Sequence, residues 1–202
     1  MMRFDLAIIA SWITSGSRVL DLGCGQGELL EHLHESKQVQ AYGVEQDAEK
    51  AAQGIAHGVT IQQGDINEEV KDYPDNSFDF VVLSQTLQQV SNPLSIIREM
   101  LRVGRRGIVS FPNFAHWRNR VQVGFQGQTP VTRELPYDWH DTPNIRLITI
   151  KDFTRFCLRY GFNIYDSVPI RSYYKENTGT VVSRFPNLRA TYGIFLLGRD
   201  HE

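Results

Sequence analysis

One stretch near the start of the chain, from Arg18 to Glu28, constrains the fold more than any other. It reads Arg-Val-Leu-Asp-Leu-Gly-Cys-Gly-Gln-Gly-Glu, so an apolar run gives way to glycines and helix-forming residues follow directly. This order indicates a buried strand, a tight turn and the start of a helix. Glycines let the backbone approach a bound molecule closely, and the free amides at a helix start attract negative charge. The stretch therefore predicts a ligand-binding loop.

Two residues of this stretch restrict the kind of ligand. A dinucleotide fingerprint, G-x-G-x-x-G, needs a glycine where this chain has Glu28. Asp21 precedes the first glycine by two residues and would repel a pyrophosphate. A zwitterionic ligand suits the loop better, because Asp21 can face an ammonium group while the amides meet a carboxylate. These residues argue against a nicotinamide-type oxidoreductase, and an ordinary glycine-rich turn is the alternative interpretation.

The rest of the chain alternates strand and helix patterns. Strands are predicted at 18–22, 39–45, 59–63, 78–83, 107–111, 162–170 and 192–197. Helices are predicted at the start of the chain and at 28–36, 48–56, 93–102 and 151–160, with Asp47 as a helix cap. Alternation of this kind requires crossover helices, so the fold class is α/β with a doubly wound, mostly parallel sheet.

Composition narrows the class of protein further. A length of 202 residues suits a single domain spanning 1–202. With 21 basic and 23 acidic side chains there is no basic field to attract nucleic acid. The two cysteines, Cys24 and Cys157, have no metal-ligand spacing around them, so we expect no metal site, no disulfide and a reducing, cytoplasmic environment. The apolar start contains Asp5 and reads as a packed amphipathic helix, so no membrane segment is expected.

The segment from Pro112 to about Thr149 has no clean periodicity and is rich in aromatic residues and prolines. A connection this long is uncommon unless it covers a ligand or forms a binding surface. We expect either a substrate lid or a protein interface, and the sequence leaves both open. Within the segment His116 and His140 are weak candidates for a catalytic base, and a solvated loop is the alternative.

Polar side chains follow three of the predicted strands. Glu45, Asp65 and Ser84 end or follow the second, third and fourth strands. Ligands of open α/β sheets bind beyond the carboxyl ends of the strands, so these side chains should surround one crevice. For Asp65 helix capping is the alternative, and for Glu45 a solvated turn.

The motif Val-Leu-Asp-Leu-Gly-Cys-Gly-Gln-Gly resembles the first motif of class I S-adenosylmethionine-dependent methyltransferases. The resemblance implies that the glycine loop holds the methionine moiety of S-adenosylmethionine or S-adenosylhomocysteine. It also implies that Glu45 accepts the ribose hydroxyls and Asp65 the adenine amino group. The cofactor-binding residues implied are Asp21, Gly23, Cys24, Gly25, Gly27, Glu45, Gln46, Asp65, Ile66 and Ser84. The fold implied is a seven-stranded sheet with an antiparallel C-terminal hairpin, whose last strand inserts between the fifth and sixth.

Two later segments are more specific. Ser-Phe-Pro-Asn-Phe-Ala-His-Trp, ending at Trp117, and Trp-His-Asp-Thr-Pro-Asn-Ile-Arg, ending at Arg146, are similar to segments of the MetW family of bacterial methionine-biosynthesis proteins. That resemblance implies a role beside a homoserine O-acyltransferase, MetX. The leading hypothesis is a cofactor-sensing partner that supports or regulates the acyltransferase.

The alternative hypothesis is a methyltransferase that acts on a small acceptor under the lid. Related small-molecule methyltransferases often carry a Glu-His pair after the fourth strand, where this chain has Gln88 and Gln89. Glutamine exchanges no proton near neutral pH and is a poor ligand for a divalent cation. Acid–base or metal chemistry is therefore disfavoured there, and the alternative interpretation is that the two glutamines face solvent on a short helix.

Overall fold

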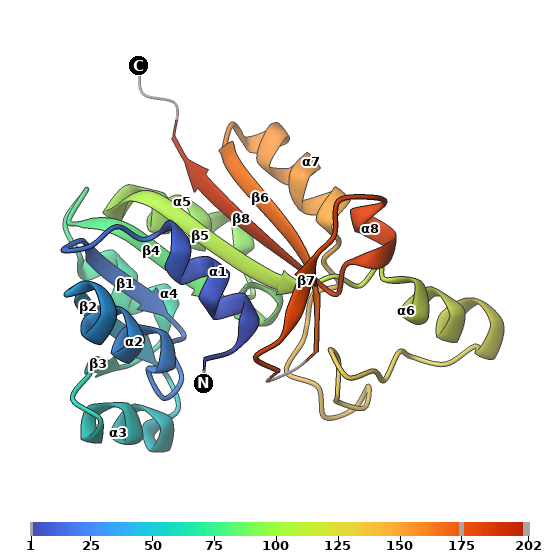
Figure 1. The fold of residues 1–202 in the computed structure, drawn as a ribbon, viewed down its shortest axis with the longest axis horizontal. Helices are drawn as coiled ribbons and strands as arrows, with labels where there is room; N and C mark the ends of the chain where they lie inside the picture. The colour runs from blue at the N-terminus through green and yellow to red at the C-terminus, as the bar shows by residue number, and fades with distance from the viewer. Residues whose placement is uncertain (1, 174–175, 200–202) are drawn as a thin grey trace.

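The chain builds one eight-stranded sheet, seen in Figure 1. The computed structural model describes residues 2–173 and 176–199. The strand order is β3-β2-β1-β4-β5-β8-β6-β7, with β1 to β5 parallel and β8, β6 and β7 each antiparallel to their neighbours. The strands are β1 (Arg18–Leu22), β2 (Gln40–Glu45), β3 (Thr60–Gln63), β4 (Phe78–Ser84), β5 (Gly104–Pro112), β6 (Asn163–Ser172), β7 (Gly179–Val181) and β8 (Tyr192–Gly198).

This topology confirms the predicted α/β class and the insertion of the last strand between the fifth and sixth. The eighth strand, β7, was not predicted. It has three residues at the edge of the sheet and pairs with β6 through Ile170 and Val181. A pattern this short is too brief to stand out from the polar stretch that contains it.

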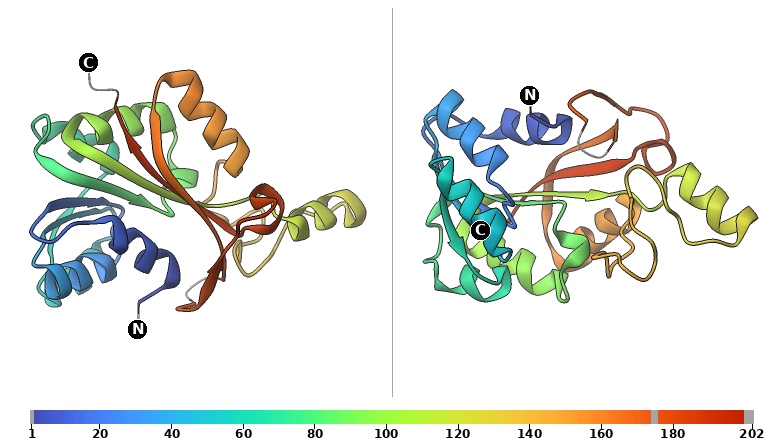
Figure 2. Two further views of the ribbon diagram at one scale, coloured as in Figure 1. Left: turned by 45° about the horizontal axis from the view of Figure 1, so that its top comes forward. Right: turned by 90° about the horizontal axis from the view of Figure 1, so that it is seen from below.

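Helices cover both faces of the sheet, as Figure 2 shows. One apolar cluster joins the strands to α4, α5 and α7, and a second joins them to α1, α2 and α3. The helices are α1 (Phe4–Trp12), α2 (Glu28–Lys37), α3 (Ala48–Ala56), α4 (Ile66–Glu69), α5 (Pro93–Val103), α6 (Trp117–Val121), α7 (Ile150–Tyr160) and α8 (Pro186–Arg189). Short 3-10 turns, η1 (Val70–Asp72) and η2 (Leu87–Gln89), follow α4 and β4.

The central strands are buried on both faces because their apolar residues alternate between the two clusters. In β1, Val19 packs with α1 and α2, whereas Leu20 and Leu22 pack on the opposite face. In β4, Val82 and Val81 divide in the same way. Continuous apolar runs of this kind are typical of parallel strands between two helical layers.

Side-chain caps fix where the helices begin. Asp47 accepts from the backbone N–H groups of Glu49 and Lys50 at 3.0 and 3.2 Å, which confirms the predicted cap of α3. Thr149 accepts from the N–H of Asp152 at the start of α7, and Gly161 ends that helix at φ 71°.

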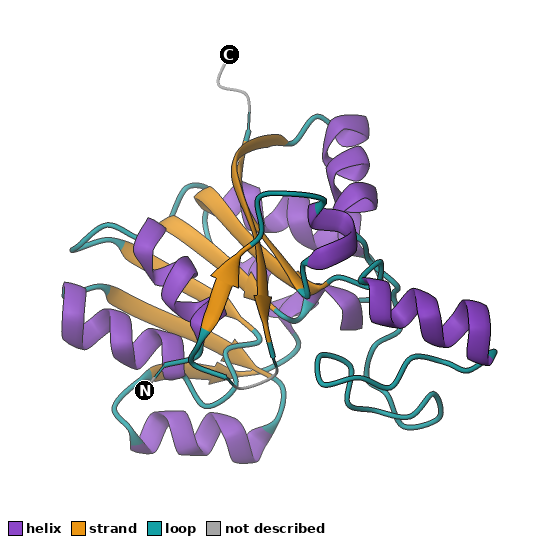
Figure 3. Cartoon of the chain, turned by 45° about the vertical axis from the view of Figure 1, so that its right-hand side comes forward, coloured by secondary structure: helices purple, strands orange, loops and turns teal. Residues whose placement is uncertain are grey.

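The segment from 112 to 149 is more regular than the sequence indicated. Its first part forms α6 and the π-helical turn η3 (Gln122–Gln126), and these project from the body of the protein (Figures 1 and 3). We call residues 117–126 the arm. Its apolar side chains Trp117, Val121, Val123 and Phe125 are exposed. An amphipathic pattern marks a helix with one buried face, so an arm with exposed apolar residues gives no such pattern.

No helix in residues 2–173 and 176–199 is long and apolar enough to cross a membrane.

Candidate functional site

A cavity of about 830 Å³ lies at the carboxyl ends of the parallel strands. Strand β1 has β2 on one side and β4 on the other, so the order of the strands reverses beside β1. Open α/β sheets bind their ligands at this kind of reversal. Nine of the ten predicted cofactor residues line it, namely Asp21, Gly23, Cys24, Gly25, Glu45, Gln46, Asp65, Ile66 and Ser84. The tenth, Gly27, precedes α2 and is not among the residues that line the cavity in the described part of the chain.

Each glycine of the loop has a different reason to lack a side chain. Gly23 has φ 81°, and a Cβ there would meet the Thr86 hydroxyl at 2.6 Å. Gly25 has φ 58° with open space where a Cβ would be, so its backbone borders the cavity. Gly27 has φ 80°, and its Cβ would meet Val59 at 3.2 Å. Gly25 leaves the backbone open to a ligand, Gly23 allows close packing against Thr86, and Gly27 allows packing of the turn against Val59.

Asp21 carries the clearest sign of a missing ligand contact. The side chain is 4% exposed, and its Oδ1 atom has no hydrogen-bond partner in the part of the chain that the structure describes. Burial raises the pKa of Asp21 from 3.8 to about 7, the Arg3 guanidinium lowers it, and Glu45 raises it. An ammonium group beside Asp21 would satisfy the orphaned oxygen and restore the charged form, so this residue fits the amino-acid end of S-adenosylmethionine.

Glu45 supports the glycine loop as well as facing the cavity. Its Oε2 accepts from the N–H of Gly25 at 2.7 Å and its Oε1 accepts from the N–H of Asp47 at 2.9 Å. A carboxylate offers about four lone-pair sites, so both oxygens can still accept ribose hydroxyls. Asp65 caps α4 by accepting from the Asn67 backbone N–H at 2.8 Å, so the helix-capping alternative holds for this residue beside its place in the cavity wall.

Cys24 is part of the loop without being a nucleophile. Its Sγ lies 3.8 Å from the carbonyl oxygen of Gly25. Burial raises the pKa of the Cys24 thiol far above its usual range, and the neighbouring Asp21 and Glu45 carboxylates raise it further. The sulfur therefore stays a thiol and serves as a small packing group.

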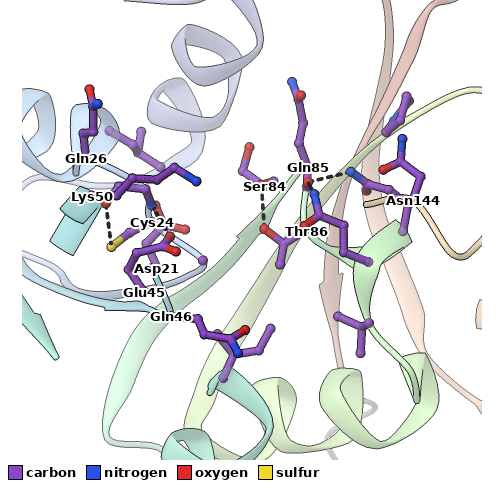
Figure 4. Close-up of a pocket in the computed structure, with 18 of the residues that line it drawn as sticks. Asp21, Cys24, Gln26, Glu45, Gln46, Lys50, Ser84, Gln85, Thr86 and Asn144 are labelled. Carbon is purple, nitrogen blue, oxygen red and sulfur yellow. Dashed lines mark hydrogen bonds between the residues drawn. The ribbon is translucent and has the colours of Figure 1, made fainter. Parts of the chain in front are cut away.

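A second wall of the cavity follows β4, and Figure 4 shows it opposite the loop. Here Ser84 lies next to Ser110, with 3.0 Å between the two hydroxyl oxygens. Gln85 has a left-handed backbone at φ 50°, uncommon for a residue with a side chain, and its Nε2 donates to Asp5 at 2.6 Å. Strained backbone of this kind concentrates at functional sites.

The paired glutamines have different environments. Both line the cavity, but Gln89 is exposed whereas Gln88 is only 4% exposed. The Gln88 carbonyl oxygen accepts from the N–H groups of Ile145 and Arg146, both at 3.0 Å. This contact holds one end of the 139–146 segment against the second wall, so the solvent-facing interpretation is wrong for Gln88.

The two histidine candidates do not line the cavity in the described part of the chain. His116 is buried beside the arm, and burial lowers its pKa, with Glu134 raising it and Arg118 and Arg171 lowering it. His140 is exposed and contacts Trp139 edge to face. His116 and His140 therefore remain outside the cavity wall, although His116 interacts electrostatically with Glu134, which lines the cavity.

Sequence reasoning missed several residues of the cavity wall. Arg3 reaches it from the start of α1, and Glu134, Pro136, Tyr137 and Asn144 reach it from the irregular segment. Arg3 pairs with Asp5 at 2.7 Å, and the Arg3 N–H donates to Glu28 at 3.2 Å. No local pattern distinguishes these residues, because they come to the cavity through tertiary packing.

This chain is similar in sequence to proteins of one family. The family model described as "Methionine biosynthesis protein MetW" matches residues 3–197. The chain belongs to the MetW family. A relative from Rhodopirellula baltica, named bifunctional methionine biosynthesis protein MetXA/MetW, is 38% identical to this MetW-family chain over 160 residues, which are 75% of the chain and 26% of the relative.

The curated relatives that match are longer proteins: the chain covers 26%, 33% and 36% of the length of three of them. Solved structures share the fold at low identity. An S-adenosylmethionine-dependent methyltransferase from Mesorhizobium loti matches with a TM-score of 0.67 at 18% identity, covering 96% of both chains. A [4+2]-cyclase, SpnF, matches with a TM-score of 0.65 at 17% identity, covering 96% of this chain and 79% of that one. A methyltransferase and a cyclase share the architecture, so the fold alone fixes no reaction.

Proposed function

We propose that this MetW-family protein binds S-adenosylmethionine or S-adenosylhomocysteine and, in that state, supports or regulates a homoserine O-acyltransferase of the MetX type. The observation that carries the proposal is that Asp21, Glu45 and Asp65, at the carboxyl ends of three neighbouring parallel strands, line one cavity. This biosynthetic role implies a cytoplasmic protein organised as one domain over 1–202.

The three carboxylates match the cofactor from end to end. Asp21 would face the ammonium group, the amides of the glycine loop the carboxylate, and Glu45 the ribose hydroxyls. Asp65 and the N–H of Ile66 would meet the adenine. S-adenosylmethionine supplies an activated methyl group, and its sulfonium adds a positive charge. The cavity wall has five carboxylates and two cationic side chains, Arg3 and Lys50, which favours a ligand of that charge.

The arm supports the partner half of the proposal. A groove of about 580 Å³ runs along it, lined by Trp117, Val121 and Val131 with basic residues beside them. Aromatic side chains with arginines are the composition that protein interfaces favour. Pro136 borders both this groove and the cavity, so a partner on the arm would contact a segment that also lines the cavity. One relative is a single protein named as bifunctional MetXA/MetW, which is consistent with a link between the two proteins.

The test is capture of purified acyltransferase by the immobilised protein. Phe125, 88% exposed on the arm, is changed to aspartate, and Leu158, 84% exposed on α7, is changed to aspartate as the matched control. We expect at least a tenfold loss of capture with Phe125→Asp alone, because a charge in an apolar interface remains unpaired. Both variants should bind S-adenosylhomocysteine like the wild type. Equal capture by the two variants would contradict the role of the arm.

A methyltransferase acting on a small acceptor is the second candidate. The cavity extends beyond the cofactor residues to Gln88, Glu134 and Asn144, which leaves space for an acceptor beside the cofactor. Transfer of a methyl group can proceed by orientation alone, so this candidate function does not require a catalytic base. Incubation with labelled S-adenosylmethionine and amine or hydroxyl metabolites distinguishes the candidates: labelled product favours the methyltransferase, and capture of acyltransferase without product favours the partner role.

A further inference from the structure

At its Glu134 end the cavity contains a carboxylate that has no partner in the described part of the chain. Glu134 is 7% exposed and lines the cavity, and neither of its carboxylate oxygens has a hydrogen-bond partner among the described residues. A tight turn fixes its position, since the N–H groups of Thr132 and Leu135 donate to each other's carbonyl oxygens at 3.0 and 3.2 Å. Buried carboxylates are normally paired and hydrogen-bonded, so this one points to a partner from outside the chain.

Arg133 and the two cations of the cavity wall are paired with carboxylates other than Glu134. Arg133, its chain neighbour, pairs with Glu176 at 3.6 Å. The two cations of the cavity wall are also paired, Arg3 with Asp5 and Lys50 with Asp47 at 3.2 Å. His116 interacts electrostatically with Glu134, but its Nδ1 atom has no hydrogen-bond partner among the described residues. No ion pair to Glu134 occurs in the described part of the chain.

Gln88 provides a second unused acceptor in the same cavity. Its Nε2 donates to the Gln85 carbonyl oxygen at 2.6 Å, and its Oε1 is buried without a partner among the described residues. The orientation of the amide is fixed, because a carbonyl oxygen accepts only from the nitrogen. The cavity wall therefore presents a carboxylate and an amide oxygen that both lack donors.

We propose that this end of the cavity binds a small protonated amine, with Glu134 as its counter-ion and Gln88 Oε1 as a further acceptor. An ammonium group has three donors and no acceptor, which is the complement of these two side chains. The inference goes beyond cofactor binding and rests on it in one respect: the cofactor occupies the end near Asp21 and leaves this end to a second ligand. That ligand would be a methyl acceptor or a sensed metabolite.

The probe is n-butylammonium, with butyrate and n-butanol as anionic and neutral molecules of similar shape. Each is titrated into protein saturated with S-adenosylhomocysteine, and binding is followed by ligand-observed NMR. We expect n-butylammonium to bind at least tenfold more tightly than the other two. Glu134→Gln, nearly equal in shape, should weaken its binding at least tenfold and Gln88→Leu severalfold. Glu68→Gln is the control, because Glu68 is exposed and pairs with Lys71.

Two results would overturn the proposal: butyrate or butanol binding as well as the amine, or n-butylammonium binding unchanged in Glu134→Gln. Folding of each variant is checked by its affinity for S-adenosylhomocysteine. If that cofactor product fails to bind the wild type, the proposed function fails separately. The amine titration is then read on the free protein, where Glu134→Gln must still lose binding more than Asp21→Asn does.

Discussion

Replacing Asp21 with asparagine should make the protein increasingly more stable than the wild type as the pH rises from 5 to 8. Burial raises the pKa of Asp21 from 3.8 to about 7, while Arg3 lowers it and Glu45 raises it. Between pH 3.8 and about pH 7 the folded state keeps the Asp21 proton, whereas the unfolded chain has already released it. The unfolding free energy of the wild type therefore falls as the pH rises through this range. Well above pH 7 Asp21 is ionised in both the folded and the unfolded state, so the unfolding free energy falls no further.

The magnitude follows from the pH interval. The roughly 2 pH units between pH 5 and pH 7, at about 1.4 kcal/mol each, give about 3 kcal/mol. Asp21 is only 4% exposed, so solvent screens little of this effect. Asparagine has almost the same shape and does not titrate. The difference in unfolding free energy between variant and wild type should therefore grow by about 3 kcal/mol over this range.

Urea unfolding of the ligand-free protein at pH 5, 6, 7 and 8 measures this difference, with Glu68→Gln as an exposed control. Saturating S-adenosylhomocysteine should remove most of the pH dependence, because its ammonium group would stabilise the charged form of Asp21. A variant that differs from the wild type by the same amount at every pH would refute the assigned environment of Asp21.

Two further predictions concern the glycine loop. Gly27→Ala should destabilise the protein by about 1–2 kcal/mol, because φ is 80° there and Val59 would lie 3.2 Å from the new Cβ; an unchanged urea midpoint would argue against this backbone. Cys24 should react with iodoacetamide at pH 8 much more slowly than free cysteine, since burial raises its pKa far above the usual range. Alkylation at the rate of free cysteine would show that the thiol is accessible and ionised.

The carboxylates of the cavity edge could be predicted from the sequence. Their prediction needs only the local strand and helix patterns and the rule that ligands bind at the carboxyl ends of parallel strands. Alternating strands and helices require parallel strands, and parallel strands bring their carboxyl ends to one edge. Asp21, Glu45 and Asp65 each lie at or just after the carboxyl end of such a strand, so their meeting at the cavity could be predicted without knowledge of packing. The sequence could not reveal that Glu45 also holds the N–H of Gly25, which is a tertiary contact.

The opposite wall could not be predicted because its residues arrive from distant parts of the chain. Gln85 is held there by Asp5, eighty residues earlier, and Glu134 sits in a turn within an irregular segment. The Gln88 carbonyl oxygen accepts from the N–H groups of Ile145 and Arg146, which are more than fifty residues later in the chain. The helices of the arm could not be predicted either. Their apolar residues face solvent, so the sequence has no periodic apolar face that would indicate a helix packed on the protein.

Calorimetry with S-adenosylmethionine and S-adenosylhomocysteine tests the central claim most directly, using the wild type, Glu45→Gln and the exposed control Glu68→Gln at neutral pH. We predict saturable binding to the wild type and the control. Affinity should fall at least tenfold in Glu45→Gln, because hydrogen bonds to a charged group contribute about 1.5–3 kcal/mol. No heat with either nucleoside at millimolar concentration, or equal affinity in Glu45→Gln, would contradict the account.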